Sequence, residues 1–514
     1  MKRYLFLTHR WLGITLCLFM AMWFLSGVVM MYVGYPKLST LERLERLPAL
    51  DPASFSINLG AAIRASGIDQ DPKGVRLTSV ASVPRYILTF DKKQVVAVNA
   101  QSGKRISGVS ASDAVAAASA FSKQGETRYL DLVQEDAWTH SKALDIHRPL
   151  HRVEVQDEDS TILYVSSRTG EVIRDATAVE RGWNWVGAWI HLLYPFRGGA
   201  LDKHWHNIVV YTSLFATVLA FSGLVIGVMR WRFSGRYSNA SKSPYRNPFM
   251  RWHHLLGLAF GVIAITWIFS GLMSMNPWKM FDSGGKLLDE ISYSGGAIKV
   301  ESFPLDLHDF LKKTHPENER PREIEWRMFD GMGYLITLDG NNRTSIVPAA
   351  QGEHQLAIFP LARLEAAGAR LLPGARIERS EVLHEYDFYY YPRSPQAMLG
   401  HMDKRLPVLR LKFNDPNSTW VHLDPYTGAV VGKLDTHQRV KRWLFALLHN
   451  WDWLPLLERR PLWDVVLILL SIGGFLVSCT GIVIGWQRLK RKQGSPKCKS
   501  QPVSGISNTQ EVTS

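Results

Sequence analysis

Long stretches without charged residues alternate with long polar segments along this chain. The uncharged stretches run from Trp11 to Tyr35, from Ile208 to Met229, from Leu255 to Met275 and from Val465 to Trp486. The hydrocarbon core of a bilayer, roughly 30 Å thick, needs about 20 residues of helix to span it. The pattern therefore predicts four transmembrane helices, with a lipid bilayer as the surroundings of the protein.

The two long polar segments, 36–190 and 276–448, show a different period. Short runs of alternating apolar and polar residues, bounded by turn residues, occupy 86–90, 95–98, 161–165, 171–173, 334–338 and 420–431. This alternation is typical of strands joined in hairpins. Helical stretches at 111–121 and 356–367 lie between them. We predict that each segment forms a small antiparallel α+β domain.

The two halves of the chain repeat each other. HRWLG at 9–13 and WFLSG at 23–27 recur, at one constant offset, as HHLLG at 253–257 and WIFSG at 267–271. SGLVIG at 222–227 recurs as TGIVIG at 480–485, and His191 recurs as His449 at that same second offset. The sequence thus indicates an internal duplication with two pairs of equivalent histidines, His9 with His253 and His191 with His449.

Basic residues near the ends of the predicted spans indicate the orientation of the chain. They cluster before the first span, between the second and third spans, and after the fourth span, at Lys2, Arg3, Arg10, Arg230, Arg232, Arg236, Lys242, Arg246, Arg251, Arg488, Lys490, Arg491 and Lys492. Such residues are enriched on the cytoplasmic side. We expect both termini to be cytoplasmic and both long polar segments to be exported in a multi-pass membrane protein; in a bacterium this would be the inner membrane, with the segments in the periplasm. The net charge of +14 is then mainly a topology signal, and no nucleic-acid partner is expected.

These signals predict an ordered series of segments. They are a cytoplasmic N-terminus with the first transmembrane helix (1–35), a first exported domain (36–190), an interfacial segment with the second helix (191–230), a basic loop (231–252), the third helix (253–275), a second exported domain (276–448), an interfacial segment with the fourth helix (449–487) and a basic tail expected to be disordered (488–514). The expected fold class is a membrane α-helical bundle of four transmembrane helices, internally duplicated, with two exported α+β domains.

At this point the motifs resemble a known family. Hairpins ending in VNAQSG at 98–103 or LDPYTG at 423–428 are enclosed by spans that begin HRWLG and end SGLVIG. This arrangement resembles the PepSY-associated transmembrane family over nearly the whole chain. The resemblance implies that the exported domains are PepSY-like and that the protein acts in bacterial iron acquisition. Some members resemble di-haem inner-membrane reductases of ferric siderophores.

The four repeated histidines are candidate haem ligands. If the halves pack about a pseudo-two-fold axis along the membrane normal, His9 lies opposite His253 and His191 lies opposite His449. Two facing imidazoles commonly hold a b-type haem iron, and the CxxCH motif for covalent attachment is absent. We therefore predict two haem b groups. The alternative to haem ligation is that each histidine lies at the level of the lipid headgroups as an ordinary interfacial residue.

Other residues rank second as candidates. His254 adjoins His253, while His204 and His206 lie at the start of the second span without repeated counterparts. Arginines that could pair with haem propionates are Arg10, Arg251, Arg181 and Arg439. His147 and His151 have metal-binding spacing, but Pro149 argues against a helix there. Acids and phenols at 385–391 are candidates for contact with a ferric chelate.

The sequence is compatible with two main functions. The first is a haem-containing reductase that passes electrons across the membrane to an exported acceptor such as a ferric siderophore. The soluble parts contain no evident GxGxxG or Walker motif, so the electrons would come from a separate cytoplasmic donor or from quinol. The alternative is a non-redox membrane scaffold whose PepSY-like domains bind peptides, proteases or iron chelates.

Overall fold

A computed structural model describes residues 2–493 except 92–93, 123–124, 198, 315–319, 351–353, 394–399 and 401–402. The chain divides into two compact units. The first unit comprises Met1–Met22, Leu214–Ile265 and Ile472–Ser514, and the second comprises Trp23–Ser213 and Thr266–Ser471. The predicted tail beyond residue 493 lies outside the described residues.

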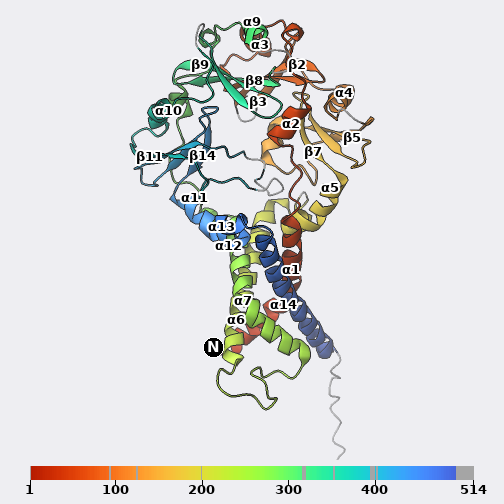
Figure 1. The fold of residues 1–514 in the computed structure, drawn as a ribbon. Helices are drawn as coiled ribbons and strands as arrows, with labels where there is room; N and C mark the ends of the chain where they lie inside the picture. The colour runs from red at the N-terminus through yellow and green to blue at the C-terminus, as the bar shows by residue number, and fades with distance from the viewer. Residues whose placement is uncertain are drawn as a thin grey trace, which may run out of the picture. The chain divides into compact units, whose positions relative to one another are not determined.

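Within the described residues, four helices are long and apolar enough to cross a membrane (Figure 1). They are α1 (Lys2–Met30), α6 (Trp205–Arg230), α7 (Pro248–Ser274) and α14 (Leu462–Gln493). The prediction of four spans is confirmed, and the protein is a membrane protein. The first helix ends five residues before the predicted Tyr35, because Gly34 and Pro36 follow and the residue before a proline is disfavoured in helical conformation. The fourth helix continues past the predicted boundary at 487.

Small residues set the packing of the helices in the first unit. A Cβ on Gly261 of α7 would lie 3.1 Å from Leu224 of α6, and a Cβ on Gly473 of α14 would collide with Phe260 of α7. Such close approach is typical of membrane helices, which associate largely through van der Waals contact between small-residue faces.

The second unit contains three antiparallel sheets among the described residues. One has six strands in the order β10-β9-β8-β1-β2-β3, and the other two follow chain order as β4-β5-β6-β7 and β11-β12-β13-β14. The strands are β1 (Gly74–Val80), β2 (Val83–Asp91), β3 (Gln94–Asn99), β4 (Thr127–Val133), β5 (Leu150–Val155), β6 (Ile162–Ser166), β7 (Val172–Ala176), β8 (Glu323–Phe329), β9 (Met332–Leu338), β10 (Thr344–Pro348), β11 (Ile377–Leu383), β12 (Val408–Phe413), β13 (Trp420–Leu423) and β14 (Val430–Leu434). Every predicted hairpin corresponds to paired strands here.

The six-stranded sheet joins the two polar segments. Strand β1 of the first segment pairs antiparallel with β8 of the second, with Val75 opposite Trp326. One hydrophobic core lies on this sheet and includes Leu77, Leu88 and Ile324. The expectation of two separate exported domains therefore needs revision, because β1 and β8 share one sheet and one core within a single compact unit.

Short helices cover the sheets and complete the unit. The helix α4 (Ala111–Ser122) packs on β4-β5-β6-β7 and α10 (Leu361–Gly368) packs on β12 (Figure 1). The predicted helix at 356–367 is shorter than expected because Pro360 occupies its N-cap position. The remaining α-helices are α2 (Thr40–Arg46), α3 (Leu59–Ser66), α5 (Ala178–Asn184), α8 (Glu290–Ser294), α9 (Leu307–Thr314), α11 (Thr436–Lys441), α12 (Leu448–Asn450) and α13 (Leu454–Leu457).

Candidate functional site: two facing histidine pairs

In the first unit, two of the candidate histidines pack against a neighbouring helix at a serine or threonine that is followed by a glycine. We call such a dipeptide a hydroxyl-glycine pair. His9 of α1 packs on Ser222 and Gly223 of α6, and a Cβ on Gly223 would lie only 2.6 Å from the His9 ring. His253 of α7 packs on Thr480 and Gly481 of α14, where a Cβ would lie 3.4 Å from the ring. The missing side chain of each glycine makes room for an imidazole.

The second unit repeats this arrangement. His191 follows a π-helical turn (Trp185–Trp189) and packs on Ser26 and Gly27 of α1. His449 of α12 packs on Ser270 and Gly271 of α7. A Cβ on Gly27 would lie 3.7 Å from the His191 ring, and one on Gly271 would lie 3.6 Å from the His449 ring. These distances are ordinary van der Waals contact, whereas the contact of Gly223 with His9 is much closer.

Hydrogen bonds fix which ring nitrogen carries the proton. Nδ1 of His9, His253 and His449 lies 3.2, 3.1 and 3.1 Å from the backbone carbonyl oxygens of Leu219, Val477 and Trp267, respectively. For His191, Nδ1 lies 3.0 Å from the Ser26 hydroxyl, which donates its own proton to the Trp23 carbonyl and so accepts from Nδ1. A carbonyl oxygen can only accept, so Nδ1 must be the protonated nitrogen. The lone pair is therefore on Nε2 in every ring.

A hydroxyl reinforces each of these bonds. Ser26, Ser270 and Thr480 place their oxygens 3.0 Å from Nδ1 of His191, His449 and His253, and the distance from Ser222 to His9 is 3.4 Å. Each hydroxyl also donates to the carbonyl three residues before it. Ring orientation and tautomer are thus set twice, as is usual for histidines that bind metals.

The four histidines form two facing pairs, one inside each unit. The ring centres of His9 and His253 are 6.3 Å apart, with 42° between the ring planes. Those of His191 and His449 are 6.1 Å apart at 73°. The structure therefore brings together the partners that the repeat predicts, each histidine facing its equivalent in the other half of the chain.

This geometry fits a haem iron held between two imidazoles. Two metal–nitrogen bonds of about 2.0 Å, each extended by about 1.1 Å from nitrogen to ring centre, place the ring centres about 6 Å apart. Both observed separations match that value. In addition, a Cβ on Gly257, one helical turn after His253, would meet nothing within 4 Å.

The protonation state of the second pair also suits ligation. Burial, followed by the charge that His449 would carry, lowers the pKa of His191 to about 3. Burial likewise lowers the pKa of His449. Both rings are neutral at physiological pH, and neutral imidazole is the form that coordinates a metal. Among the described residues no three His, Cys, Asp or Glu side chains gather, so any ligation by protein groups would rest on such pairs.

The second-rank histidines are placed differently. Nε2 of His254 donates to the carbonyl of Gly227 at 2.8 Å, and its Nδ1 lies 2.8 Å from the hydroxyl of Ser243. Both ring nitrogens of His254 are therefore used within the protein, and it connects α7 to α6 and to the loop between them. His204 and His206 are exposed near the start of α6 and do not join either pair.

The candidate arginines divide into two groups. Arg181 donates to the carbonyls of Ser160 and Ala176, and Arg439 donates to the equivalent carbonyls of Ser418 and Leu434. These two guanidinium groups tie α5 and α11 to the adjacent hairpins. Arg10 differs, because its buried Nε has no hydrogen-bond partner. Arg251 is exposed on α7.

His147 and His151 do not form a metal site on a helix. His147 ends a 3-10 turn and His151 lies on β5, and the Arg148–Pro149 bond between them is cis. Nε2 of His151 donates to the carbonyl of Val109 at 2.9 Å, and its Nδ1 lies 3.1 Å from the Tyr129 hydroxyl. The expectation that Pro149 excludes a helix is confirmed.

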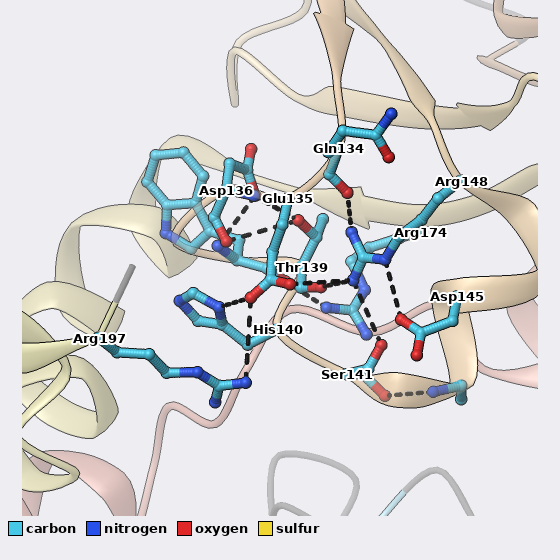
Figure 2. Close-up of polar contacts among 12 residues, drawn as sticks. Gln134, Glu135, Asp136, Thr139, His140, Ser141, Asp145, Arg148, Arg174 and Arg197 are labelled. Atoms are coloured by element: carbon cyan, nitrogen blue, oxygen red, sulfur yellow. Dashed lines mark hydrogen bonds and ion pairs between the residues drawn. The ribbon is translucent and has the colours of Figure 1, made fainter. Parts of the chain in front are cut away.

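A polar loop after β4 contacts Arg197, a residue that follows His191 in the chain (Figure 2). Glu135 bonds His140 and lies 4.0 Å from Arg197, which is six residues beyond His191. The ring of His140 meets Tyr194 edge-on, with centres 4.7 Å apart. The loop thus contacts two side chains, Tyr194 and Arg197, that follow His191 in the chain.

The corresponding loop after β11 packs on the segment that holds His449. Arg442 bonds Asp452 at 2.9 Å and also donates to the backbone of Phe388, and the Phe388 and Trp443 rings stack with centres 5.0 Å apart. Asp387, one of the predicted chelate contacts, is instead paired with the buried Arg410. The acids and phenols of this loop therefore serve largely to hold it in place.

Sequence reasoning missed the hydroxyl-glycine pairs as part of the site. The four dipeptides were visible inside the repeated motifs, at Ser26-Gly27, Ser222-Gly223, Ser270-Gly271 and Thr480-Gly481. Their recurrence beside each of the four paired histidines becomes apparent only when the helices are paired in space.

Comparison with models of protein families places the transmembrane part of the chain. A family model described as "PepSY-associated TM region" matches residues 6–324, which is more than half of the chain. This is the family whose motifs the sequence resembles. A search of curated proteins found no match.

Proposed function

The chain belongs to the PepSY-associated TM region family, and from this premise and its two facing histidine pairs we propose that it is a transmembrane haem reductase. It would pass electrons across the bacterial inner membrane to an exported acceptor, a ferric siderophore, in iron acquisition. The observation that carries the proposal is the pairing of four rings whose tautomers all leave Nε2 free for a metal.

In this proposal the residues of the chain bind and orient two haem b groups. His9 with His253, and His191 with His449, would each hold one of these groups through their Nε2 atoms. Each bound haem supplies a one-electron ferric/ferrous couple. Ser26, Ser222, Ser270 and Thr480 hold the imidazoles in the ligating tautomer, and their bonds to Nδ1 raise ligand basicity. Arg10, with its unpartnered buried Nε, is suited to pair with a propionate.

The duplication read from the sequence supports this arrangement. Equivalent histidines occupy equivalent contacts in both halves, and the equivalent arginines Arg181 and Arg439 make equivalent bonds. The basic segments 1–10, 231–252 and 488–492 would place the His9–His253 pair toward the cytoplasm. Electrons would enter there from a separate donor and leave from the His191–His449 pair.

An absorption spectrum of the purified protein tests the proposal directly. We expect a red preparation whose Soret band shifts on reduction, and a pyridine haemochrome assay approaching two haems per chain. A colourless preparation after expression with adequate haem supply would refute the reductase and favour the scaffold alternative.

Single substitutions then assign the two sites. His253→Leu and His449→Leu should each lower the haem content from two to one, because a hydrocarbon side chain cannot coordinate iron. The His449→Leu protein should still accept electrons from the donor but fail to reduce an exported acceptor. His206→Leu, at an exposed histidine outside both pairs, is the matched control and should keep both haems.

A further inference from the structure

All charged side chains among the described residues of the first unit are basic. Its described residues, 2–22, 214–265 and 472–493, include no aspartate or glutamate. Exposed basic residues of the loop and adjoining helix ends are Arg230, Arg232, Arg236, Lys242, Arg246 and Arg251. The positive-inside rule accounts for their sign, but it requires no particular loop structure.

The loop 231–247 nevertheless has a defined structure. Its backbone closes with bonds from Arg232 N–H to the carbonyl of Lys242 and from Tyr237 N–H to that of Ser241, at 3.1 and 2.9 Å. The Asn239 amide donates to the carbonyl of Ser243 at 3.0 Å. The basic side chains therefore project from a fixed backbone.

His254 anchors this loop beside the candidate haem ligand. Its ring bonds Ser243 in the loop and Gly227 at the end of α6, and Tyr245 meets it edge-on with ring centres 5.5 Å apart. His254 immediately follows His253 on α7. The cationic loop is thereby fixed one residue from a histidine of the first pair.

An exposed aromatic side chain lies within the loop. Phe233 is 73% exposed, and Arg232 and Arg236 flank it in sequence. An apolar anchor surrounded by polar and charged residues is the usual composition of a protein–protein interface.

We propose that loop 231–247 is the docking surface for an acidic, soluble one-electron carrier protein that delivers electrons to the His9–His253 site. This inference rests on the proposed function. For a flavodoxin-type carrier, the anionic flavin hydroquinone loses one electron and becomes the neutral semiquinone without releasing a proton. That electron would pass to the ferric haem that His9 and His253 would hold, which would become ferrous. Opposite charges on the two proteins would accelerate their encounter.

Stopped-flow reduction of the haem-loaded protein tests the proposal with two probes of opposite charge. A reduced acidic flavodoxin should react more slowly as ionic strength rises from about 0.01 to about 1 M, because the screening length falls from about 30 to about 3 Å. The reduced methyl viologen cation should show the opposite salt dependence. Flavodoxin rates that are independent of salt would overturn the proposal.

Charge reversal assigns the effect to the loop. Lys242→Glu combined with Arg246→Glu should slow reduction by flavodoxin about tenfold at low salt and leave reduction by viologen unchanged or faster. The matched control is Arg488→Glu combined with Lys490→Glu at the end of α14, which should have a clearly smaller effect. Equal losses in both double variants would overturn the assignment to the loop.

Two further outcomes are distinguishable. If the loop variant loses affinity only for anionic-lipid nanodiscs and keeps its flavodoxin rate, the surface binds lipid headgroups and the proposal fails. If the starting protein shows no haem spectrum, the proposed function fails and this inference fails with it. Haem that viologen reduces, combined with a flavodoxin rate insensitive to salt and to the variant, overturns the docking surface alone.

Discussion

At the scale of single residues, each candidate ligand packs against the same arrangement of a hydroxyl, a glycine and a backbone carbonyl. A glycine lets the imidazole approach the neighbouring helix, while the hydroxyl before it and a carbonyl three residues earlier both bond Nδ1. His254 shows the contrast, because its Nε2 carries the proton and bonds Gly227. Two adjacent histidines on one helix thus have opposite tautomers, and only His253 keeps Nε2 available for a metal.

The hydroxyl contributes a measurable share of this orientation. Ser270→Ala should weaken haem retention at the His191–His449 site by about tenfold, since loss of such a supporting bond typically costs 10–100-fold in metal affinity. Ser270→Thr is the control and should retain haem, because Thr480 performs the same role natively beside His253. The measurement is haem transfer to excess apomyoglobin. Equal retention by the alanine and threonine variants would contradict the role of the hydroxyl.

The glycines should differ in their tolerance of a methyl group. Gly223→Ala places a Cβ 2.6 Å from the His9 ring, so it should displace that ring and lower haem content from two to one. Gly27→Ala places its Cβ 3.7 Å from His191 and should keep both haems. Pyridine haemochrome analysis of both variants checks this order, and a reversed order would contradict the packing described above.

At the scale of elements, the pairing of β1 with β8 couples the two polar segments through buried charge. Glu323 on β8 accepts from Arg76 on β1 and from Arg43 on α2, each at 2.6 Å, and Arg76 also bonds Glu171. Glu323 is almost completely buried. Burial opposes its ionisation, but the charges of Arg76 and Arg43 lower its pKa to about 2.

Removing that carboxylate should destabilise the joined sheet. Glu323→Gln removes the buried carboxylate that Arg43 and Arg76 share and leaves Glu171 as the remaining partner of Arg76, at a cost of about 3 kcal/mol in the free energy of unfolding. Glu154→Gln, whose partner Arg128 is largely exposed, is the matched control and should cost less than about 1 kcal/mol. Denaturant unfolding of the detergent-solubilised protein, followed by tryptophan fluorescence, compares the two. Similar losses in both variants would contradict a structural role for the buried network.

The same network predicts an acid-dependent loss of stability. Because the folded-state pKa of Glu323 lies below its ordinary value of 4.5, its contribution is complete above about pH 4.5 and is lost as pH falls toward about 2. The stability of the Glu323→Gln protein should depend less on pH across that window. Parallel pH profiles for the two proteins would show that other groups control acid unfolding.

At the scale of the whole molecule, the direction of the proposed electron flow depends on topology. The basic segments predict that both chain ends and the loop 231–252 are cytoplasmic. Reporter fusions at Lys242 and Ser495 should therefore report the cytoplasm, and a fusion at Asp157 should report the exported side. A fusion series placing Ser495 and Asp157 on the same side would contradict the orientation and reverse or abolish the proposed electron path.

The sequence by itself determined the four membrane helices, the strands of the hairpins and the equivalent histidines. The helices and strands depend on the spacing of nearby apolar residues, and the histidines can be matched by aligning the two halves of the chain. Hydrophobic runs as long as 465–486 have no other stable environment than a bilayer or a buried core.

Only the tertiary structure decided which partners meet. Val75 and Trp326 pair across β1 and β8 although about half the chain separates them, and no local pattern encodes that register. Likewise, His253 and His254 are the same residue type at adjacent positions. Their tautomers differ because the backbone carbonyls of neighbouring helices face different ring nitrogens. The physical reason is that hydrogen-bond direction and ring contact depend on how helices pack, whereas helix and strand formation depend mainly on nearby residues.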